Sequence, residues 1–125
     1  MPFNGLPRFC RLHLKRDFKA VIQGGIKLRK EELVLWWRVN PNNPNGIRFA
    51  VVVSKKLGAA VARNRTKRLL REAFRLNIEN IKKGIDIIVS PRDGEKLSNM
   101  HAAQESLMTL CGKAAILRCS SEKQD

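Results

Sequence analysis

The segment from residue 54 to residue 75 constrains this chain more than any other, because it is both strongly basic and amphipathic. It holds eight Lys and Arg residues against a single acid, Glu72, a net charge of +7. At about 100° per residue, a helix in this segment gathers apolar side chains on one side. Those residues are Ala62, Thr66, Leu69, Leu70, Ala73 and Leu76. Such a side has to pack on another layer of the protein.

The opposite side of the same helix carries a column of cations. Its polar residues are Asn64, Lys67, Arg68, Arg71 and Arg75. Solvated helix faces usually mix signs, and here only Arg68 and Glu72 are spaced for an i, i+4 pair. A phosphate backbone would offset the repulsion among these cations, so we interpret the face as polyanion-binding. A plain solvated face and a membrane-surface helix are the alternatives.

Shorter elements flank this helix. Phe18, Val21 and Ile22 are spaced i, i+3, i+4 and predict a short helix at 15–23 that ends at Gly24-Gly25. Alternating and β-branched residues predict strands, and an N-cap at Ser98 or Asn99 predicts a last helix. The strands fall at 32–39, 47–54 and 85–90, and the last helix at 98–112.

The turn-forming residues at 40–46 should join the first two strands into an antiparallel hairpin. The resulting order is α-β-β-α-β-α in a single α+β domain, although the pairing order of the strands cannot be read from the sequence. We expect this domain to occupy residues 14–113, between an N-terminal arm at 1–13 and a flexible tail at 114–125.

The whole chain is basic, with 25 Lys and Arg against 11 Asp and Glu in 125 residues and a formal charge of +14. This predicts an acidic partner, whether RNA, DNA or an anionic membrane surface. Cys10, Cys111 and Cys119 form no CxxC pair and suit reduced thiols. There is no run that resembles a signal peptide or a span of ~20 apolar residues, so we expect a soluble, cytoplasmic protein.

Groups that could perform catalysis are few. Asp17, Asp86 and Asp93 are far apart in the sequence, and His13 and His101 have no ligand-like spacing to a cysteine. No nucleophile elbow, HExxH motif or phosphate-binding glycine loop is present. We therefore predict no catalytic residue, no protein-bound metal and no protein partner.

The aromatic residues of the hairpin divide between two faces. Trp37 and Phe49 share their strand faces with aliphatic residues and are predicted to lie in the core. Trp36 shares its face with Arg38 instead. A sheet face that mixes aromatic and cationic side chains is typical of single-stranded nucleic-acid binding, because bases stack on rings while cations contact phosphates. Trp36 is therefore a candidate binding residue.

The basic helix and its surroundings closely resemble the bacterial ribonuclease P proteins. The signature is Ala62-Arg63-Asn64-Arg65-x-Lys67-Arg68-x-x-Arg71-x-x-Phe74-Arg75, preceded by Val53-Ser54-Lys55-Lys56-x-Gly58-x-Ala60-Val61. The patterns Arg11-Leu12-x4-Asp17-Phe18-x-x-Val21-x-x-x-Gly25 and Gly84-x-Asp86-Ile87-Ile88-Val89 are similar as well. The resemblance covers roughly residues 8–113.

This resemblance implies a left-handed βαβ crossover around the signature helix, against the general right-handed rule. It also implies a subunit that binds a catalytic RNA and the 5′ leader of precursor tRNA, while the RNA performs the cleavage and holds the required Mg²⁺. The residues facing the catalytic RNA would be Lys55, Lys56, Arg63, Asn64, Arg65, Lys67, Arg68, Arg71 and Arg75. The leader-binding cleft would hold Phe18, Ile22, Trp36 and Arg38, although Ile22 stands where the family commonly has an aromatic residue.

Three other functions would also suit a chain this basic. A ribosomal or other structural RNA-binding protein would share the salt-sensitive affinity for RNA. A stand-alone nuclease would cleave without an RNA subunit. A DNA-binding regulator would prefer duplex DNA to structured RNA.

Overall fold

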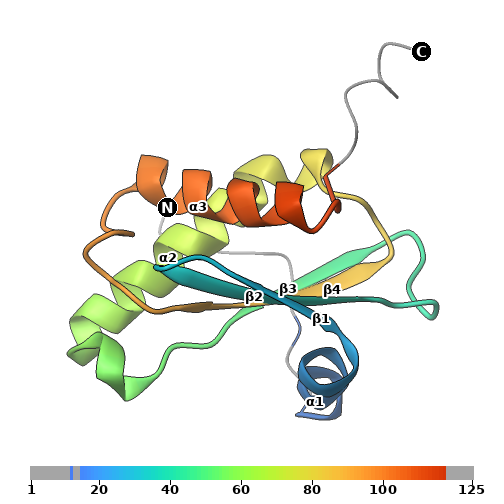
Figure 1. Cartoon of the computed structure of the whole chain (residues 1–125), viewed down its shortest axis with the longest axis horizontal. Helices are drawn as coiled ribbons and strands as arrows, with labels where there is room; N and C mark the ends of the chain where they lie inside the picture. The colour runs from blue at the N-terminus through green and yellow to red at the C-terminus, as the bar shows by residue number, and fades with distance from the viewer. Residues whose placement is uncertain (1–11, 13–14, 118–125) are drawn as a thin grey trace, which may run out of the picture.

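A central four-stranded sheet organises the chain, with helices on both of its faces (Figure 1). The computed structural model describes Leu12 and residues 15–117. The elements in chain order are α1 (Lys15–Gly24), β1 (Ile26–Arg29), β2 (Leu33–Val39), β3 (Ile47–Val51), the short turn η2 (Lys55–Leu57), α2 (Ala60–Asn77), the short turn η3 (Ile78–Asn80), β4 (Ile85–Pro91) and α3 (Met100–Lys113). The domain is a single α+β unit, as the sequence predicted.

The last strand, β4, occupies the interior of the sheet. The strand order is β1-β2-β4-β3, with β2 antiparallel and β3 parallel to β4. The predicted hairpin between 32–39 and 47–54 is therefore wrong, because β4 separates the two strands. Every residue of β4 is buried, and a strand that is buried along its whole length is most stable where neighbours cover both its faces and both its edges.

The edge strand β1 was missed by the sequence analysis. Its four residues pair with β2 in an antiparallel register that places Ile26 opposite Trp37 and Lys27 opposite Trp36. The hairpin of this fold is thus β1–β2, and the element order becomes α-β-β-β-α-β-α. β1 is short and mostly exposed, so its alternation is a weak signal next to Gly24-Gly25.

Helices α2 and α3 cover one face of the sheet and α1 lies on the other (Figure 1). The connection from β3 through α2 to the parallel strand β4 is a βαβ crossover around the signature helix. The main core lies under α2 and α3, and a smaller cluster of Leu12, Val21, Ala50 and Ile88 lies under α1. Phe18 and Trp36 pack against this smaller cluster.

Helix α2 buries a stripe formed by Thr66, Leu70, Ala73 and Phe74. Leu76, which the sequence placed on the packed side, is 54% exposed. The buried stripe includes Phe74 and not Leu76 because the ring of Phe74 stacks on Phe49 of β3 in the core. The cationic side of α2 consequently faces away from the sheet.

Both ends of the described chain contact the core. The Leu12 amide donates to the Phe49 carbonyl at 3.1 Å. Ile116 is buried, and Leu117 forms a bridge with Ile81, so the packed domain continues past residue 113. The rest of the predicted arm and tail lies outside the described residues, apart from Ala114 and Ala115, which follow α3 directly.

Candidate nucleic-acid interface

The cations predicted to bind RNA form an exposed surface on α2 and the turn before it. Lys55, Lys56, Asn64, Arg65, Arg68 and Arg75 are exposed, while Arg63, Lys67 and Arg71 are half-buried. The Ser54 hydroxyl accepts the Lys56 amide at 3.2 Å and begins η2. Gly58 has φ 140°, which favours glycine, and allows the chain to turn from η2 into α2.

Arg75 and Arg65 have partners within the domain. Arg75 pairs with Glu72, and the shared hydrogen bonds lower the pKa of Glu72 and raise that of Arg75. Glu72 lies four residues after Arg68 and was predicted to be able to pair with it, but in the structure its carboxylate is paired with Arg75. Arg65 Nη2 donates to the Ser98 carbonyl at 3.0 Å. Arg75 therefore offers less free charge to a ligand than Arg68.

Five other cations of this surface are poorly compensated. No ion pair with a described carboxylate involves Lys55, Lys56, Arg63, Lys67 or Arg68. Unpaired cations on adjacent turns repel one another, and a polyanion would relieve that repulsion. This surface meets the electrostatic requirement for binding a phosphate backbone.

A hollow of about 190 Å³ lies within the same surface, lined by Val53, Ala60, Arg63, Asn64 and Lys67. Arg63 Nε is buried and has no hydrogen-bond partner among the described residues. An unsatisfied guanidinium N–H is costly in a folded protein, and a phosphate oxygen would satisfy it. The residues of the Arg63-Asn64 pair thus converge on one site, together with Lys67.

On the other face of the sheet, α1 and β2 bring together two of the predicted cleft residues. Phe18 and Trp36 are both partly buried against the small cluster under α1. Lys27 Nζ lies 5.6 Å from the centre of the Trp36 ring, a cation–π distance. Ile22 is 43% exposed and does not pack against this cluster. The structure therefore places Phe18 and Trp36 against one cluster and leaves Ile22 outside it.

The fourth cleft residue, Arg38, belongs to a buried network. Asp86 has no exposed surface and accepts hydrogen bonds from Arg38, Arg48 and Asn40. Arg48 also pairs with Asp17 of α1 at 3.1 Å, and the bonds to Asp86 raise the pKa of Arg48. The network ties α1 to β3 and β4, so it fixes the position of α1 on the sheet. Asp17 and Asp86 are thus brought together through one guanidinium.

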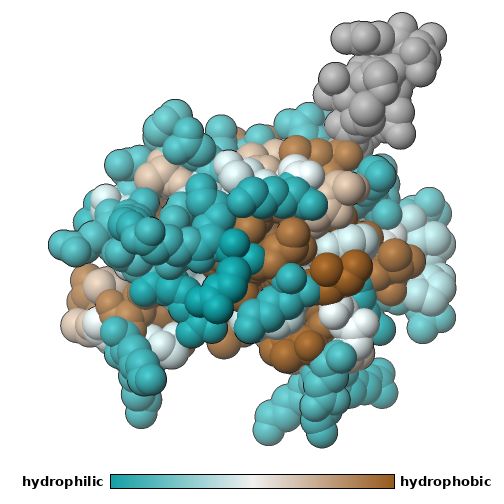
Figure 2. Space-filling view, viewed as in Figure 1, coloured by the Kyte–Doolittle hydropathy of each residue, from teal (hydrophilic) through white to brown (hydrophobic). Residues whose placement is uncertain are grey.

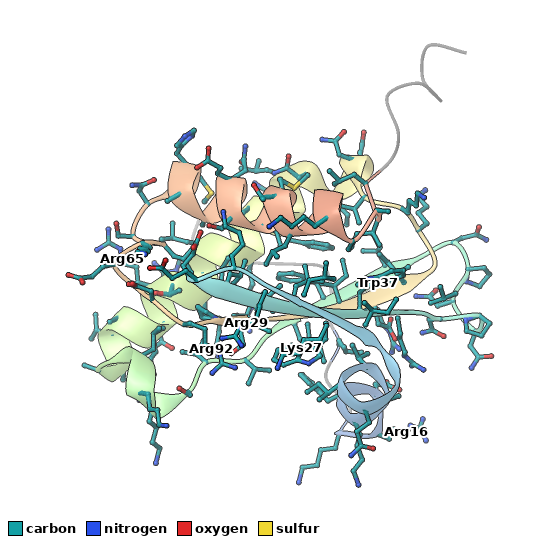
Figure 3. All side chains as sticks on the ribbon, in the orientation of Figure 1. Arg16, Lys27, Arg29, Trp37, Arg65 and Arg92 are labelled. Atoms are coloured by element: carbon teal, nitrogen blue, oxygen red, sulfur yellow. The ribbon has the colours of Figure 1, made fainter. Side chains whose placement is uncertain are left out.

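Three cations on this face were missed by the sequence analysis. Lys27, Arg29 and Arg92 lie on the same side of the sheet as α1 (Figure 3). Arg92 follows β4, and its amide donates to the Glu32 carbonyl at 2.8 Å. The alternation of Lys27 and Arg29 with two apolar residues was the signal that could have revealed them. They extend the positive surface beside Trp36.

In the described part of the chain, no three His, Cys, Asp or Glu side chains lie close enough together to hold an ion. None of its helices is long and apolar enough to cross a bilayer.

An arginine-rich helix on one face of the sheet and a group of aromatic and cationic side chains on the other are features of a nucleic-acid-binding α+β domain. The family model described as Ribonuclease P matches residues 6–115. The ribonuclease P protein component of Maridesulfovibrio salexigens is 36% identical over 115 residues, covering 90% of this chain and 92% of the relative. The chain therefore belongs to the ribonuclease P protein family, whose members are subunits of the ribonucleoprotein that processes tRNA 5′ ends.

Solved structures of the family share this fold. The Thermotoga maritima protein, in complex with 1-(4-fluorophenyl)-2-thiourea, aligns with a TM-score of 0.73 at 37% identity, covering 81% of this chain and 96% of that one. The Staphylococcus aureus protein aligns with a TM-score of 0.75 at 31% identity, covering 88% and 98% of the two chains. The family suggested by the sequence signature is confirmed.

Proposed function

We propose that this subunit binds the ribonuclease P RNA through the cationic surface of η2 and α2. The observation that carries the proposal is the set of uncompensated cations beside the unsatisfied Arg63 Nε. Arginine favours this role because its planar fork binds phosphate oxygens in bidentate fashion. The residues assigned to the RNA interface are Lys55, Lys56, Arg63, Asn64, Arg65, Lys67, Arg68, Arg71 and Arg75.

The cleft between α1 and the sheet is assigned to the single-stranded 5′ leader of precursor tRNA. A base would stack on Trp36 or Phe18 while cations contact the flanking phosphates. Lys27 and Arg29, which the structure adds to this face, suit the second role. Arg38 donates a hydrogen bond to Asp86, so we assign it two roles: it positions the neighbouring residues of the site, and it contacts RNA. Ile22 is assigned to the outer rim because it is exposed.

The protein's contribution to the reaction is electrostatic and positional. Its cations offset the repulsion between the catalytic RNA and the precursor, which raises substrate affinity. The RNA subunit chiefly holds the Mg²⁺ ions that the holoenzyme requires and hydrolyses one phosphodiester, leaving a 5′-phosphate on the mature tRNA. The site of action is the cytoplasm, where tRNA is processed in bacteria.

A reconstitution assay tests this assignment. The full chain is mixed with a ribonuclease P RNA and precursor tRNA at low Mg²⁺, and 5′ leader release is measured. Stimulated cleavage by the mixture, with none by protein alone, is the expected result. Absence of stimulation would favour a purely structural RNA-binding protein, and cleavage without the RNA subunit would indicate a nuclease. Tighter binding to duplex DNA than to either RNA would indicate a DNA-binding regulator.

A further inference from the structure

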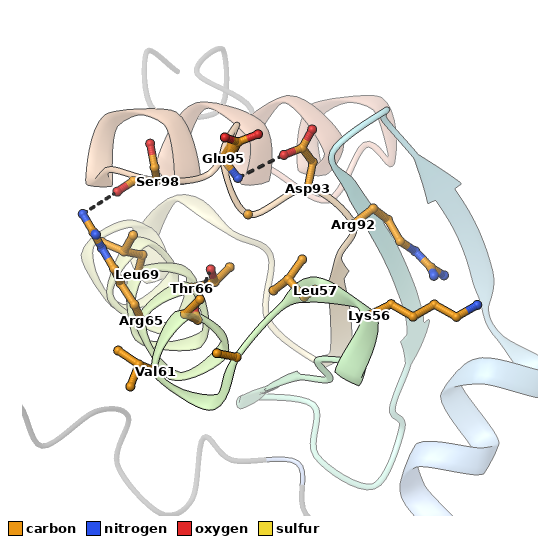
Figure 4. Close-up of a pocket in the computed structure, with 13 residues that line it drawn as sticks. Lys56, Leu57, Val61, Arg65, Thr66, Leu69, Arg92, Asp93, Glu95 and Ser98 are labelled. Carbon is orange, nitrogen blue, oxygen red and sulfur yellow. Dashed lines mark hydrogen bonds between the residues drawn. The ribbon is translucent and has the colours of Figure 1, made fainter.

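A second recess lies beside the cationic surface, at the N-terminal end of α2. It is bounded by η2 and the first turns of α2 on one side and by the loop between β4 and α3 on the other (Figure 4). Its volume is about 700 Å³, within the range of small-ligand sites. In the space-filling view, hydrophobic residues reach the surface at this end of α2, at the lower left (Figure 2).

The walls of this recess are aliphatic. Leu57, Val61 and Leu69 line it, and Val61 is 81% exposed, the highest value among the large apolar residues that the structure describes as exposed. Gly94 lies on the loop side, where an added Cβ would sit 3.7 Å from Leu57 Cγ and from Thr66 Oγ1. An apolar surface left open in so basic a protein is costly unless a ligand covers it.

The rim of the recess is positive and partly fixed. Lys56 and Arg92 lie along one side, and their side chains extend together away from Leu57, toward the α1 side of the sheet (Figure 4). At the opposite side, Arg65 is held in place by its hydrogen bond to the Ser98 carbonyl. Two acids also line the recess, but Asp93 Oδ1 accepts the amides of Glu95 and Lys96 and so stabilises its own turn. Aliphatic walls under a cationic rim complement a flat base that carries flanking phosphates.

We infer that this recess receives one unpaired nucleobase of the ribonuclease P RNA. The inference rests on the proposed function, because it assigns the α2 surface to that RNA. Splayed-out bases are the usual target of sequence-specific RNA recognition, and an arginine plane can stack on them. Here Leu57, Val61 and Leu69 contact the base, the Arg65 guanidinium borders it, and Lys56 and Arg92 reach the neighbouring phosphates. A second copy of a chain with charge +14 would be repelled from the same rim.

Filling the recess tests the inference. Gly94→Leu projects a side chain between Leu57 and Thr66 at ordinary contact distances and without positive φ. Gly112→Leu is the matched control, because Gly112 is exposed on α3 and also has room for a side chain. We expect Gly94→Leu to lower affinity for the ribonuclease P RNA by about tenfold, because the apolar contact between the base and the wall of the recess is lost. The salt dependence should stay unchanged, because no phosphate contact is removed.

Chemical probing of base edges in the complex identifies the occupant. The full chain should protect one unpaired nucleotide of the RNA subunit, and Gly94→Leu should restore its reactivity while Gly112→Leu does not. If folded Gly94→Leu has wild-type affinity and an unchanged footprint, the inference is overturned. A side chain of a protein partner would then be the better candidate for the occupant of the recess. If wild-type protein itself fails to bind the RNA, the proposed function fails instead.

A second, smaller substitution keeps the inference testable if Gly94→Leu does not fold. Val61→Ser removes apolar surface from the wall at a site that is 81% exposed, so the fold should tolerate it. Val39→Ser is its control, since Val39 is 63% exposed at the end of β2. Affinity for the RNA should fall several-fold in Val61→Ser alone. Equal affinities for the two serine variants would contradict the inference independently of Gly94→Leu.

Discussion

The rings of Phe49 and Phe74 stack face to face, with centroids 4.2 Å apart and planes inclined by 7°. Phe49 belongs to β3 and Phe74 to α2, and both are fully buried. The contact therefore fixes the rotation of α2 about its own axis on the sheet. That rotation decides which side chains of the helix face solvent, so a core contact sets the orientation of the cationic surface.

Truncating one of these rings should destabilise the whole domain. Phe74→Ala is expected to lower the free energy of unfolding by about 3–5 kcal/mol, because it leaves a cavity under α2. Urea denaturation measures the loss. Leu76→Ala, two residues along the same helix and 54% exposed, should change stability by less than about 1 kcal/mol. Similar losses for both variants would contradict the described packing of α2.

Removing the buried carboxylate of β4 should also be costly. Asp86→Ala leaves the guanidinium groups of Arg38 and Arg48 without their shared acceptor, and breaking such buried pairs costs about 3–5 kcal/mol. Thermal or urea unfolding measures the effect. Glu105→Ala removes an exposed acid from α3 and serves as the control. A stability loss below about 1 kcal/mol for Asp86→Ala would show that the network does not hold α1 on the sheet.

Local sequence patterns predicted the elements of the fold better than their arrangement. Helical spacing and alternation located α1, α2, α3 and three of the strands. The insertion of β4 between β2 and β3 could not be read, because pairing depends on contacts between distant segments. The turn-rich loop at 40–46 led us to predict that the two strands beside it pair with each other. In the structure the fully buried strand β4 lies between them instead.

The candidate site was predicted where its chemistry is local and missed where it depends on packing. A run of cations on one helix face is visible in sequence, so the α2 surface was found. Lys27 and Arg29 were missed together with β1, and Lys27 contacts Trp36 only because the two strands pair. The Asp86 network was hidden because Asp17, Arg48 and Asp86 come from three separate elements.

Salt dependence should distinguish the cations that contact RNA. Arg68→Ala is expected to weaken binding to the ribonuclease P RNA and to flatten the slope of log K against log salt by up to ~0.7–0.9 per lost phosphate contact. Lys113→Ala, which removes the same charge at the end of α3, is the control and should leave the slope nearly unchanged. Filter binding over a salt series measures both. An unchanged slope in Arg68→Ala would remove Arg68 from the interface.

Stacking in the cleft should depend on the Trp36 ring. Trp36→Ala is expected to cost ~1–3 kcal/mol in affinity for leader-bearing precursor tRNA, measured on the reconstituted holoenzyme. Trp36→Phe keeps an aromatic ring and should recover most of that loss. Leaderless tRNA provides the second control, because its affinity should not change. An equal loss for both substrates would indicate a folding defect rather than a lost stacking contact.

The Cys111 thiol should be inert in the folded protein. Burial raises its pKa from an ordinary value of 9.0 to about 12, and the thiolate is the reactive form. At pH 8 the thiol therefore stays protonated as well as inaccessible. Iodoacetamide labelling followed by peptide mass spectrometry should find Cys111 unmodified in native protein and modified in urea. Labelling of Cys111 at comparable rates in both conditions would contradict its burial.

The central place of β4 has a consequence for biosynthesis. Ribosomes deliver β2 and β3 well before β4, yet neither strand pairs with the other. The four-stranded sheet therefore cannot form until residues 85–91 have emerged from the ribosome. Its assembly is late and depends on contacts between distant segments. Until β4 has emerged, α2 has no completed sheet to pack against. During that time the unfolded nascent chain, with its many positive charges, remains close to ribosomal RNA.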